Sequence, residues 1–194
     1  MLKKLSMLIG LVCCLSCQMH RPDLQPPSGP FFQSLGIKFN FEDGSQRQSG
    51  RILWRFDDRL VKLVFFTPLN QAGLELDASG EAVALINFLN KTYWRGDFRN
   101  LLDRLWGIEI GLAQLKPLLV KGLIPQTEFD QQGIVASIEA NVETGTPKAI
   151  RLRHGAAILT LRIYKNELYP GKIVLIDYSG RYRAADLESV LNDD

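Results

Sequence analysis

Short apolar runs of alternating pattern, separated by turn-forming residues, constrain the fold of this chain most strongly. From Phe31 to about Trp94 short apolar runs are separated by turn formers, and Ile37, Phe39 and Phe41 share one strand face. Such runs, joined by short turns, predict an antiparallel meander. We expect its strands at residues 35–42, 51–56, 60–66, 74–77, 82–89 and 91–94.

The period changes to that of a helix between Asp97 and Gly122. Asp97 is a suitable N-cap, and apolar residues follow at helical spacing until Gly107, which predicts a first helix. A second helical pattern ends at Gly122 and contains Pro117. The proline predicts either a kink or a helix that begins only near Lys116.

The chain then returns to strand patterns. We expect strands at residues 134–141, 149–154, 158–164 and 172–178, and a short surface helix within residues 185–194. The resulting fold class is α+β and mainly β: a curved sheet or partial barrel with two apolar helix faces packed against it. At 194 residues and 46% hydrophobic content, one domain at residues 31–194 is the expected organisation.

A leucine stands where a turn should face water. Pro68 favours an extended Thr67, and Asn70 and Gly73 are turn formers, so Leu69 is expected at the tip of a loop between two strands. Two interpretations are open. Leu69 folds back onto the core, or the loop offers an apolar tip to a membrane or a lipid.

The first residues have the pattern of an export signal. Lys3 and Lys4 precede an apolar run that is too short to span a bilayer. The segment Cys14-Leu15-Ser16-Cys17 resembles the bacterial lipobox, which implies removal of residues 1–16 and lipid attachment at Cys17; cleavage before Cys14 fits less well. The alternative is an ordinary signal peptide whose cysteines only pack.

Residues 17–30 are rich in proline and poor in apolar side chains. They are expected to act as an extended tether. In lipoproteins similar to this one, a residue other than Asp after the lipidated cysteine implies the outer membrane, and Gln18 occupies that position.

Charge and cysteine content exclude several classes of function. Loss of residues 1–16 removes two of 23 basic residues and leaves 21, against 21 acidic residues, so nucleic acid is not an expected partner. The cysteines are Cys13, Cys14 and Cys17, which leaves no disulfide and no cysteine metal site in the domain. No metal or cofactor is predicted.

Candidates for catalysis are few. His154 is the only histidine of the domain and is expected to have a surface or hydrogen-bonding role. Asp57-Asp58 and Asp193-Asp194 fit solvated turn and terminal positions. We therefore expect no enzyme, although a periplasmic lipoprotein enzyme using His154 is one alternative. Arginines 151, 153 and 162 either line a cavity mouth or face outward, and strand alternation favours the outward position.

The stretch from Gly50 to Pro125 resembles the LolB family, outer-membrane lipoproteins that receive other lipoproteins from a periplasmic carrier and insert them into the outer membrane. The residues that carry the resemblance are Thr67-Pro68-Leu69, Leu74-Glu75-Leu76, Thr92-Tyr93, Leu101-Leu102, Gly107-Ile108-Glu109-Ile110, Leu112, Leu115 and Gly122. Family members typically have Gly where this chain has Asn70. Because Asn tolerates positive φ, we expect the turn to form. Pro117 and one residue inserted before Gly122 also depart from the family pattern.

The resemblance implies an unclosed antiparallel β-barrel, or half-barrel, with helices over its opening and a hydrophobic cavity for acyl chains. It implies a membrane-inserting loop at Pro68, Leu69 and Asn70. The expected cavity residues are Ile52, Trp54, Phe56, Leu63, Phe65, Leu101, Leu105, Leu115 and Leu119.

The partners that the resemblance implies are acylated lipoproteins as cargo, a LolA-like periplasmic carrier and outer-membrane phospholipids. The protein is expected to be a monomer anchored through Cys17 at the periplasmic face of the outer membrane. The alternative is a structural or assembly lipoprotein of the same fold that binds a protein partner or another lipid.

Overall fold

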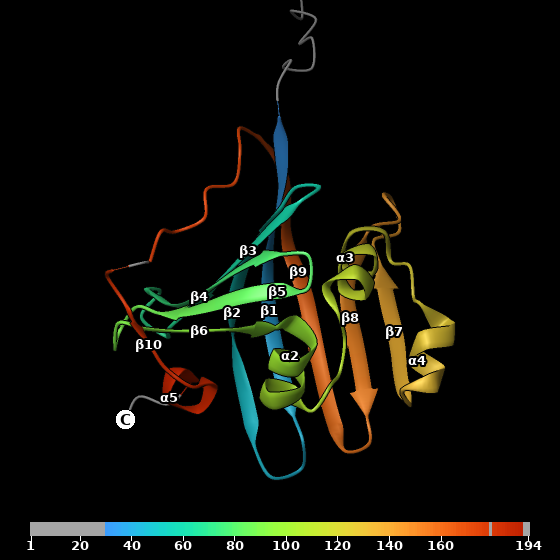
Figure 1. The fold of residues 1–194 in the computed structure, drawn as a ribbon. Helices are drawn as coiled ribbons and strands as arrows, with labels where there is room; N and C mark the ends of the chain where they lie inside the picture. The colour runs from blue at the N-terminus through green and yellow to red at the C-terminus, as the bar shows by residue number, and fades with distance from the viewer. Residues whose placement is uncertain (1–29, 179, 192–194) are drawn as a thin grey trace, which may run out of the picture.

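One curved sheet forms the body of the protein (Figure 1). The computed structural model describes residues 30–178 and 180–191, and the strands of this part form a single ten-stranded sheet in the order β10-β6-β5-β4-β3-β2-β1-β9-β8-β7. Adjacent strands are antiparallel, except that β10 is parallel to β6. The strands are β1 (Phe31–Glu42), β2 (Arg47–Phe56), β3 (Leu60–Phe66), β4 (Ala72–Ser79), β5 (Ala82–Asn87), β6 (Thr92–Asp97), β7 (Ile134–Ala140), β8 (Pro147–His154), β9 (Ala157–Pro170) and β10 (Arg183–Ala184).

Helices cover one side of this sheet. Helix α2 (Phe98–Trp106) lies in front of β1 in Figure 1, α3 (Leu112–Lys121) lies in front of β8, and α4 (Gln126–Gln131) lies beside β7. The terminal strands β10 and β7 are at opposite ends of the strand order, so the sheet is open. The prediction of an α+β, mainly β half-barrel with helices over its opening is confirmed.

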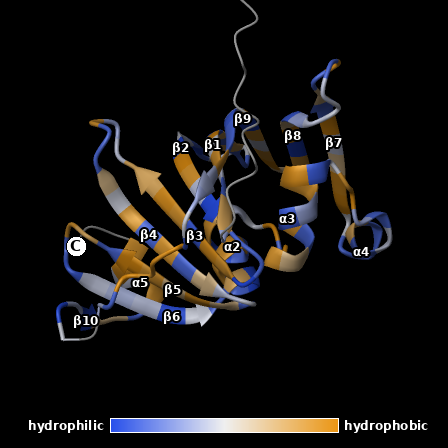
Figure 2. Ribbon diagram, turned by 90° about the horizontal axis from the view of Figure 1, so that it is seen from above, coloured by the Kyte–Doolittle hydropathy of each residue, from blue (hydrophilic) through white to orange (hydrophobic). Residues whose placement is uncertain are grey.

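Strand alternation places apolar side chains on the helix-covered face. Leu35 pairs with Trp54 and Ile37 pairs with Ile52 across β1 and β2, and all four side chains are buried. Figure 2 shows the alternation as hydrophobic and hydrophilic segments that follow one another along β4. The core therefore lies between this concave face and the helices.

The two covering helices begin and end at well-defined residues. Asp97 caps α2, since its Oδ1 accepts from the backbone N–H groups of Arg99 (2.9 Å) and Asn100 (3.3 Å). Gly107 and Gly122 end α2 and α3 in the left-handed conformation, with φ of 62° and 65°. These three predicted boundaries are confirmed.

Helix α3 starts at Leu112, so the predicted start near Lys116 is wrong. Pro117 lies inside the helix. The first turn is held by the Glu81 carboxylate, which accepts from the backbone N–H of Leu112 (3.3 Å) and of Ala113 (3.4 Å). This partner from the β4–β5 turn satisfies two N–H groups that a helix start leaves free, and it is too far away in sequence to be recognised from the pattern.

The segment after β9 is not the strand that was predicted at residues 172–178. Strand β9 continues to Pro170, which pairs with Phe31, and β1 is already paired with β2 on its other edge. Both edges of β1 are therefore occupied. The segment crosses the outer face of the sheet instead, where the N–H of Ile176 donates to Asp77 Oδ2 at 2.9 Å.

The C-terminal end of the described chain returns to the concave side. Helix α5 (Leu187–Leu191) falls within the predicted helical stretch, but Val190 is fully buried in the core, so the helix is not only a surface element. Helix α4 was not predicted. It has six residues, and its one apolar side chain, Phe129, gives no periodic signal although it is fully buried.

A polar cluster is buried on the outer face of the sheet. Lys62 Nζ lies 2.7 Å from Glu75 Oε1 and 3.7 Å from Asp77 Oδ1, and all three side chains are less than a tenth exposed. One cation thus faces two carboxyl groups. Burial raises the pKa of Asp77 to about 6, against the opposing effects of the Ile176 N–H and of Lys62.

This shift makes stability depend on pH. The folded state binds the Asp77 proton more tightly than the unfolded chain does, so the group's contribution to stability is complete below about pH 4 and is lost as pH rises to about 6. The loss is roughly 2 to 3 kcal/mol. Asp77→Asn never ionises, so its free energy of unfolding relative to wild type should rise by about this amount between about pH 4 and pH 8. Denaturant titrations at both pH values check this, and an unchanged difference would contradict it.

The Glu81 cap should contribute to stability as well. Glu81→Ala removes the acceptor for two N–H groups of α3 and is expected to lower the free energy of unfolding by about 1 kcal/mol. The matched control is Glu109→Ala, which removes the same charge from an exposed position in the α2–α3 linker. Equal effects of the two substitutions on denaturant unfolding would show that Glu81 does not act as a cap.

Candidate functional site

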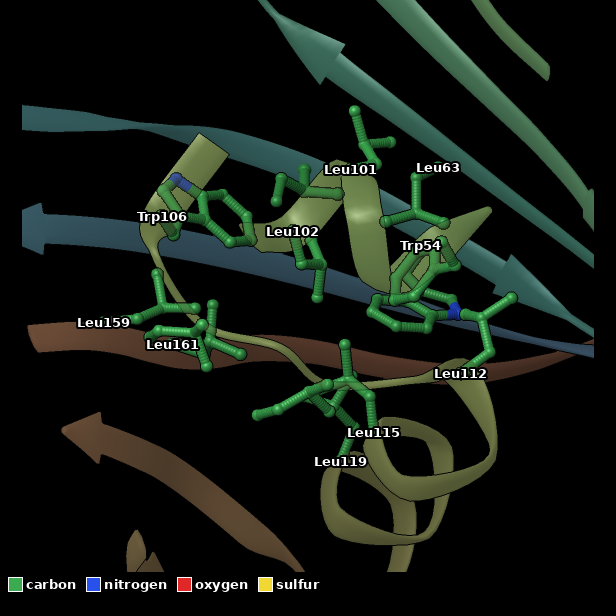
Figure 3. Packing of buried hydrophobic residues seen from close by; sticks show 14 of the residues in the cluster. Trp54, Leu63, Leu101, Leu102, Trp106, Leu112, Leu115, Leu119, Leu159 and Leu161 are labelled. Carbon is green, nitrogen blue, oxygen red and sulfur yellow. The ribbon is translucent and has the colours of Figure 1, made fainter. Parts of the chain in front are cut away.

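An apolar cavity lies between the concave face of the sheet and the covering helices. We call it the inner cavity. All of its lining side chains are apolar or aromatic, and Figure 3 shows several of them converging from the sheet, α2 and α3. They are Ile37, Ile52, Trp54, Leu63, Phe65, Leu76, Phe98, Leu101, Leu102, Leu105, Trp106, Ile108, Ile110, Leu115, Leu152, Leu159 and Leu161.

Seven of the residues expected in a cavity line the inner cavity: Ile52, Trp54, Leu63, Phe65, Leu101, Leu105 and Leu115. The structure does not place Phe56 and Leu119 among its lining residues. Leu119 is packed in the core with 1% of its surface exposed. Phe56 lines a separate surface hollow with Phe31 and Leu168, where the Lys116 ammonium lies 5.2 Å from its ring centre. Phe56 is the last residue of β2 and lies beyond the end of the cavity.

Sequence reasoning missed the part of the wall that comes from later segments. Leu159 and Leu161 face the cavity from β9, where they pair with Phe41 and Phe39 of β1. Ile108 and Ile110, in the linker between α2 and α3, are both fully buried. Their alternation with Gly107 and Glu109 was a readable signal for a buried extended segment.

The cavity is nearly closed. Its free space is about 20 Å³, enough for about one water molecule. A cavity that admits benzene has about 150 Å³. An acyl chain therefore enters only if side chains of the helices move away from the sheet.

The lid formed by α2 and α3 is tied at its margins by polar contacts. His154 Nδ1 donates to the carbonyl of Gly107 at 2.8 Å and so joins β8 to the end of α2. Lys116 Nζ donates to the carbonyl of Asp57 at 2.6 Å and joins α3 to the β2–β3 turn. Between these margins the contact of lid and sheet is apolar.

The loop between β3 and β4 projects Leu69 into solvent. Leu69 is 81% exposed, so the interpretation in which it folds back onto the core is wrong. The turn is closed by a bond from the Asn70 N–H to the Thr67 carbonyl at 2.9 Å. Asn70 has φ of 63°, which confirms that Asn forms this turn in place of Gly, and its Oδ1 accepts from Arg51 at 2.7 Å.

A second exposed leucine lies at the same end of the sheet. Leu89, in the β5–β6 turn, is 58% exposed. It borders a shallow hollow with Phe66 and Thr67 at the base of the Leu69 loop. The Phe88 N–H donates to the Gly73 carbonyl at 3.0 Å, which extends the pairing of β4 and β5 to the base of both turns.

The other candidates from the sequence occupy ordinary positions. Arg151, Arg153 and Arg162 are exposed, on the face away from the inner cavity. The described residues contain no group of three or more His, Cys, Asp or Glu side chains placed to hold a metal ion. None of the helices in this part of the chain combines the length and the apolar content needed to cross a membrane.

Comparison with known proteins agrees with this geometry. Curated proteins give no match. A family model described as outer membrane lipoprotein LolB matches residues 33–165, from β1 into β9, and so includes the inner cavity and the Leu69 loop. This family consists of proteins that bind and transport lipoproteins, not of enzymes. With a match over more than half of its length, the chain belongs to the LolB family of outer-membrane lipoproteins.

Proposed function

We propose that the protein accepts the acyl chains of lipoproteins into the inner cavity and passes them to the outer membrane at the end that carries Leu69. The observation that carries this proposal is the composition of the cavity wall, in which every lining side chain is apolar or aromatic. Each methylene group hidden from water contributes about 0.8 kcal/mol. A wall of this kind therefore suits hydrocarbon chains and offers no charged group that would bind a charged ligand.

Filling the cavity requires the lid to separate from the sheet. The contact is apolar, so opening breaks few hydrogen bonds, and an acyl chain replaces the lid side chains against the sheet. When the lid opens, Leu101, Leu105 and Leu115 lose dispersion contacts and buried surface against the sheet. Contacts with the bound acyl chain replace both. Transfer proceeds without a covalent step if each successive environment hides the chains better, which fits a receptor and not an enzyme.

Release uses the exposed loop. Leu69 stands on a turn stiffened by Asn70 and Arg51, so insertion of its side chain into a bilayer costs little additional ordering. Leu89 lies at the same end. Contact of this end with phospholipid places the bound cargo next to the bilayer into which it is inserted.

The anchor belongs to residues outside the described part. Removal of residues 1–16, lipid on Cys17 and a tether over residues 17–30 would hold the domain 31–194 at the periplasmic face of the outer membrane. A LolA-like carrier would deliver the cargo to a monomeric receptor.

The small free space of the cavity gives a second candidate its support. A structural or assembly lipoprotein would keep the core closed and bind a protein partner or another lipid on its surface. Transfer of a radiolabelled lipoprotein from carrier to liposomes separates the two functions. A receptor takes up the cargo and delivers it, whereas an assembly lipoprotein leaves it on the carrier.

Leu69→Glu should block delivery and spare acceptance. A carboxylate at the loop tip resists entry into the bilayer, so insertion into liposomes is expected to fall at least tenfold while cargo still leaves the carrier. Val142→Glu is the control, because Val142 is fully exposed at the tip of the β7–β8 turn. Equal loss in both variants, or normal insertion by Leu69→Glu, would contradict the role of the loop.

Leu105→Glu should block acceptance. Leu105 lines the cavity from α2 but is only partly buried, so the protein is expected to fold with the new carboxylate at the cavity wall. Uptake of a fluorescent fatty acid should weaken about tenfold or more, because the chain must then pack beside a charge. Asn100→Glu adds the same charge on an exposed position of α2. Unchanged uptake by Leu105→Glu would place the acyl chain elsewhere.

A further inference from the structure

One polar atom interrupts the apolar interior. Trp54 is 3% exposed and lines the inner cavity from β2. Its indole Nε1 is buried and has no hydrogen-bond partner among the described residues. Figure 3 shows this nitrogen turned toward Leu112 at the start of α3, which places it at the α3 edge of the cavity.

An unpaired indole N–H at this position is costly. A buried donor without a partner destabilises a protein by about 1 to 3 kcal/mol. Phenylalanine would fill much of the same space without a donor, as Phe41 and Phe98 do elsewhere in this core. Packing alone therefore does not explain why this position holds a tryptophan, whose ring carries an N–H donor.

Water is a poor partner for this donor. The free space of about 20 Å³ has room for one molecule, but a buried water needs two or more polar partners. The other side chains that line the cavity are hydrocarbon, apart from the indole of Trp106. The group that would satisfy Trp54 must bring its own acceptor and must itself be largely apolar.

We propose that Trp54 Nε1–H donates a hydrogen bond to the ester or amide carbonyl of a bound acyl chain. This inference rests on the proposed function of the cavity and adds a specific contact to it. An acyl chain combines the two required properties, since its tail is hydrocarbon and its carbonyl is an acceptor. The indole N–H can only donate a hydrogen bond, so its partner must be an acceptor, as a carbonyl oxygen is.

The contact sets how deeply the chain enters. With the carbonyl at Trp54, the attached cargo lies at the α3 edge and the tail runs along Leu63 and Leu101. The bond forms in an apolar surrounding, where hydrogen bonds are strong, and it relieves a donor that the empty protein leaves unpaired. Acyl lipids are thereby distinguished from hydrocarbon or ether lipids of equal length.

A matched pair of lipids tests this contact in the lipid-anchored protein. Monolauroylglycerol has an ester carbonyl, and dodecyl glyceryl ether has the same chain length without it. Their affinities are measured by displacement of a fluorescent fatty acid. Wild type should bind the ester about five- to tenfold more tightly than the ether, and Trp54→Phe should reduce this ratio to about one.

The ratio separates a lost hydrogen bond from damaged packing, since a disturbed core weakens both lipids equally. Trp94→Phe makes the same truncation at a half-buried tryptophan of β6 that does not line the inner cavity and should keep the wild-type preference. An ester preference that survives in Trp54→Phe, or that wild type lacks, overturns the inference while the cavity function stands. Failure of both lipids to bind wild type contradicts the cavity function itself.

Discussion

The apolar contact between the concave face of the sheet and the α2–α3 lid is the interaction on which the rest of this structure depends. An open sheet with one apolar face is stable only when that face is covered, and here two short helices and their linker cover it. The attraction is proportional to buried area and has no direction. The same contact can therefore be made by lid side chains or by a hydrocarbon ligand, as the proposed function requires.

Directional contacts are placed where they do not oppose this exchange. The Asp97 and Glu81 caps define the starts of α2 and α3, while His154 and Lys116 tie the lid to the sheet at its margins. These contacts lie at the margins of the apolar contact and not within it. Trp54 is the exception, because its unpaired N–H lies within the apolar region itself. A fully satisfied interior would have favoured the closed state more strongly.

The buried ionic side chains lie on the outer face. Lys62, Glu75 and Asp77 lie under the segment that crosses the back of β4, and the raised pKa of Asp77 shows what this placement costs. The covering segment continues to β10 and α5, so it joins the back of the sheet to the end near Leu69. The two faces thus differ in kind, with hydrocarbon on one and a fixed ionic cluster on the other.

The sequence by itself determined the class of fold, most strand positions, the caps at Asp97, Gly107 and Gly122, and the turn that carries Leu69, because these follow from local periodicity and backbone preference. The exposure of Leu69 was decided by the tertiary structure. The resemblance to the LolB family added six of the nine cavity-lining residues that β2, β3 and α2 contribute. Only the tertiary structure decided which apolar residues face the free space and which are core, since both kinds look alike in a sequence. Long-range pairing decided the rest: Glu81 holds the start of α3, β9 occupies the last free edge of β1, and the following segment is left to cross the outer face.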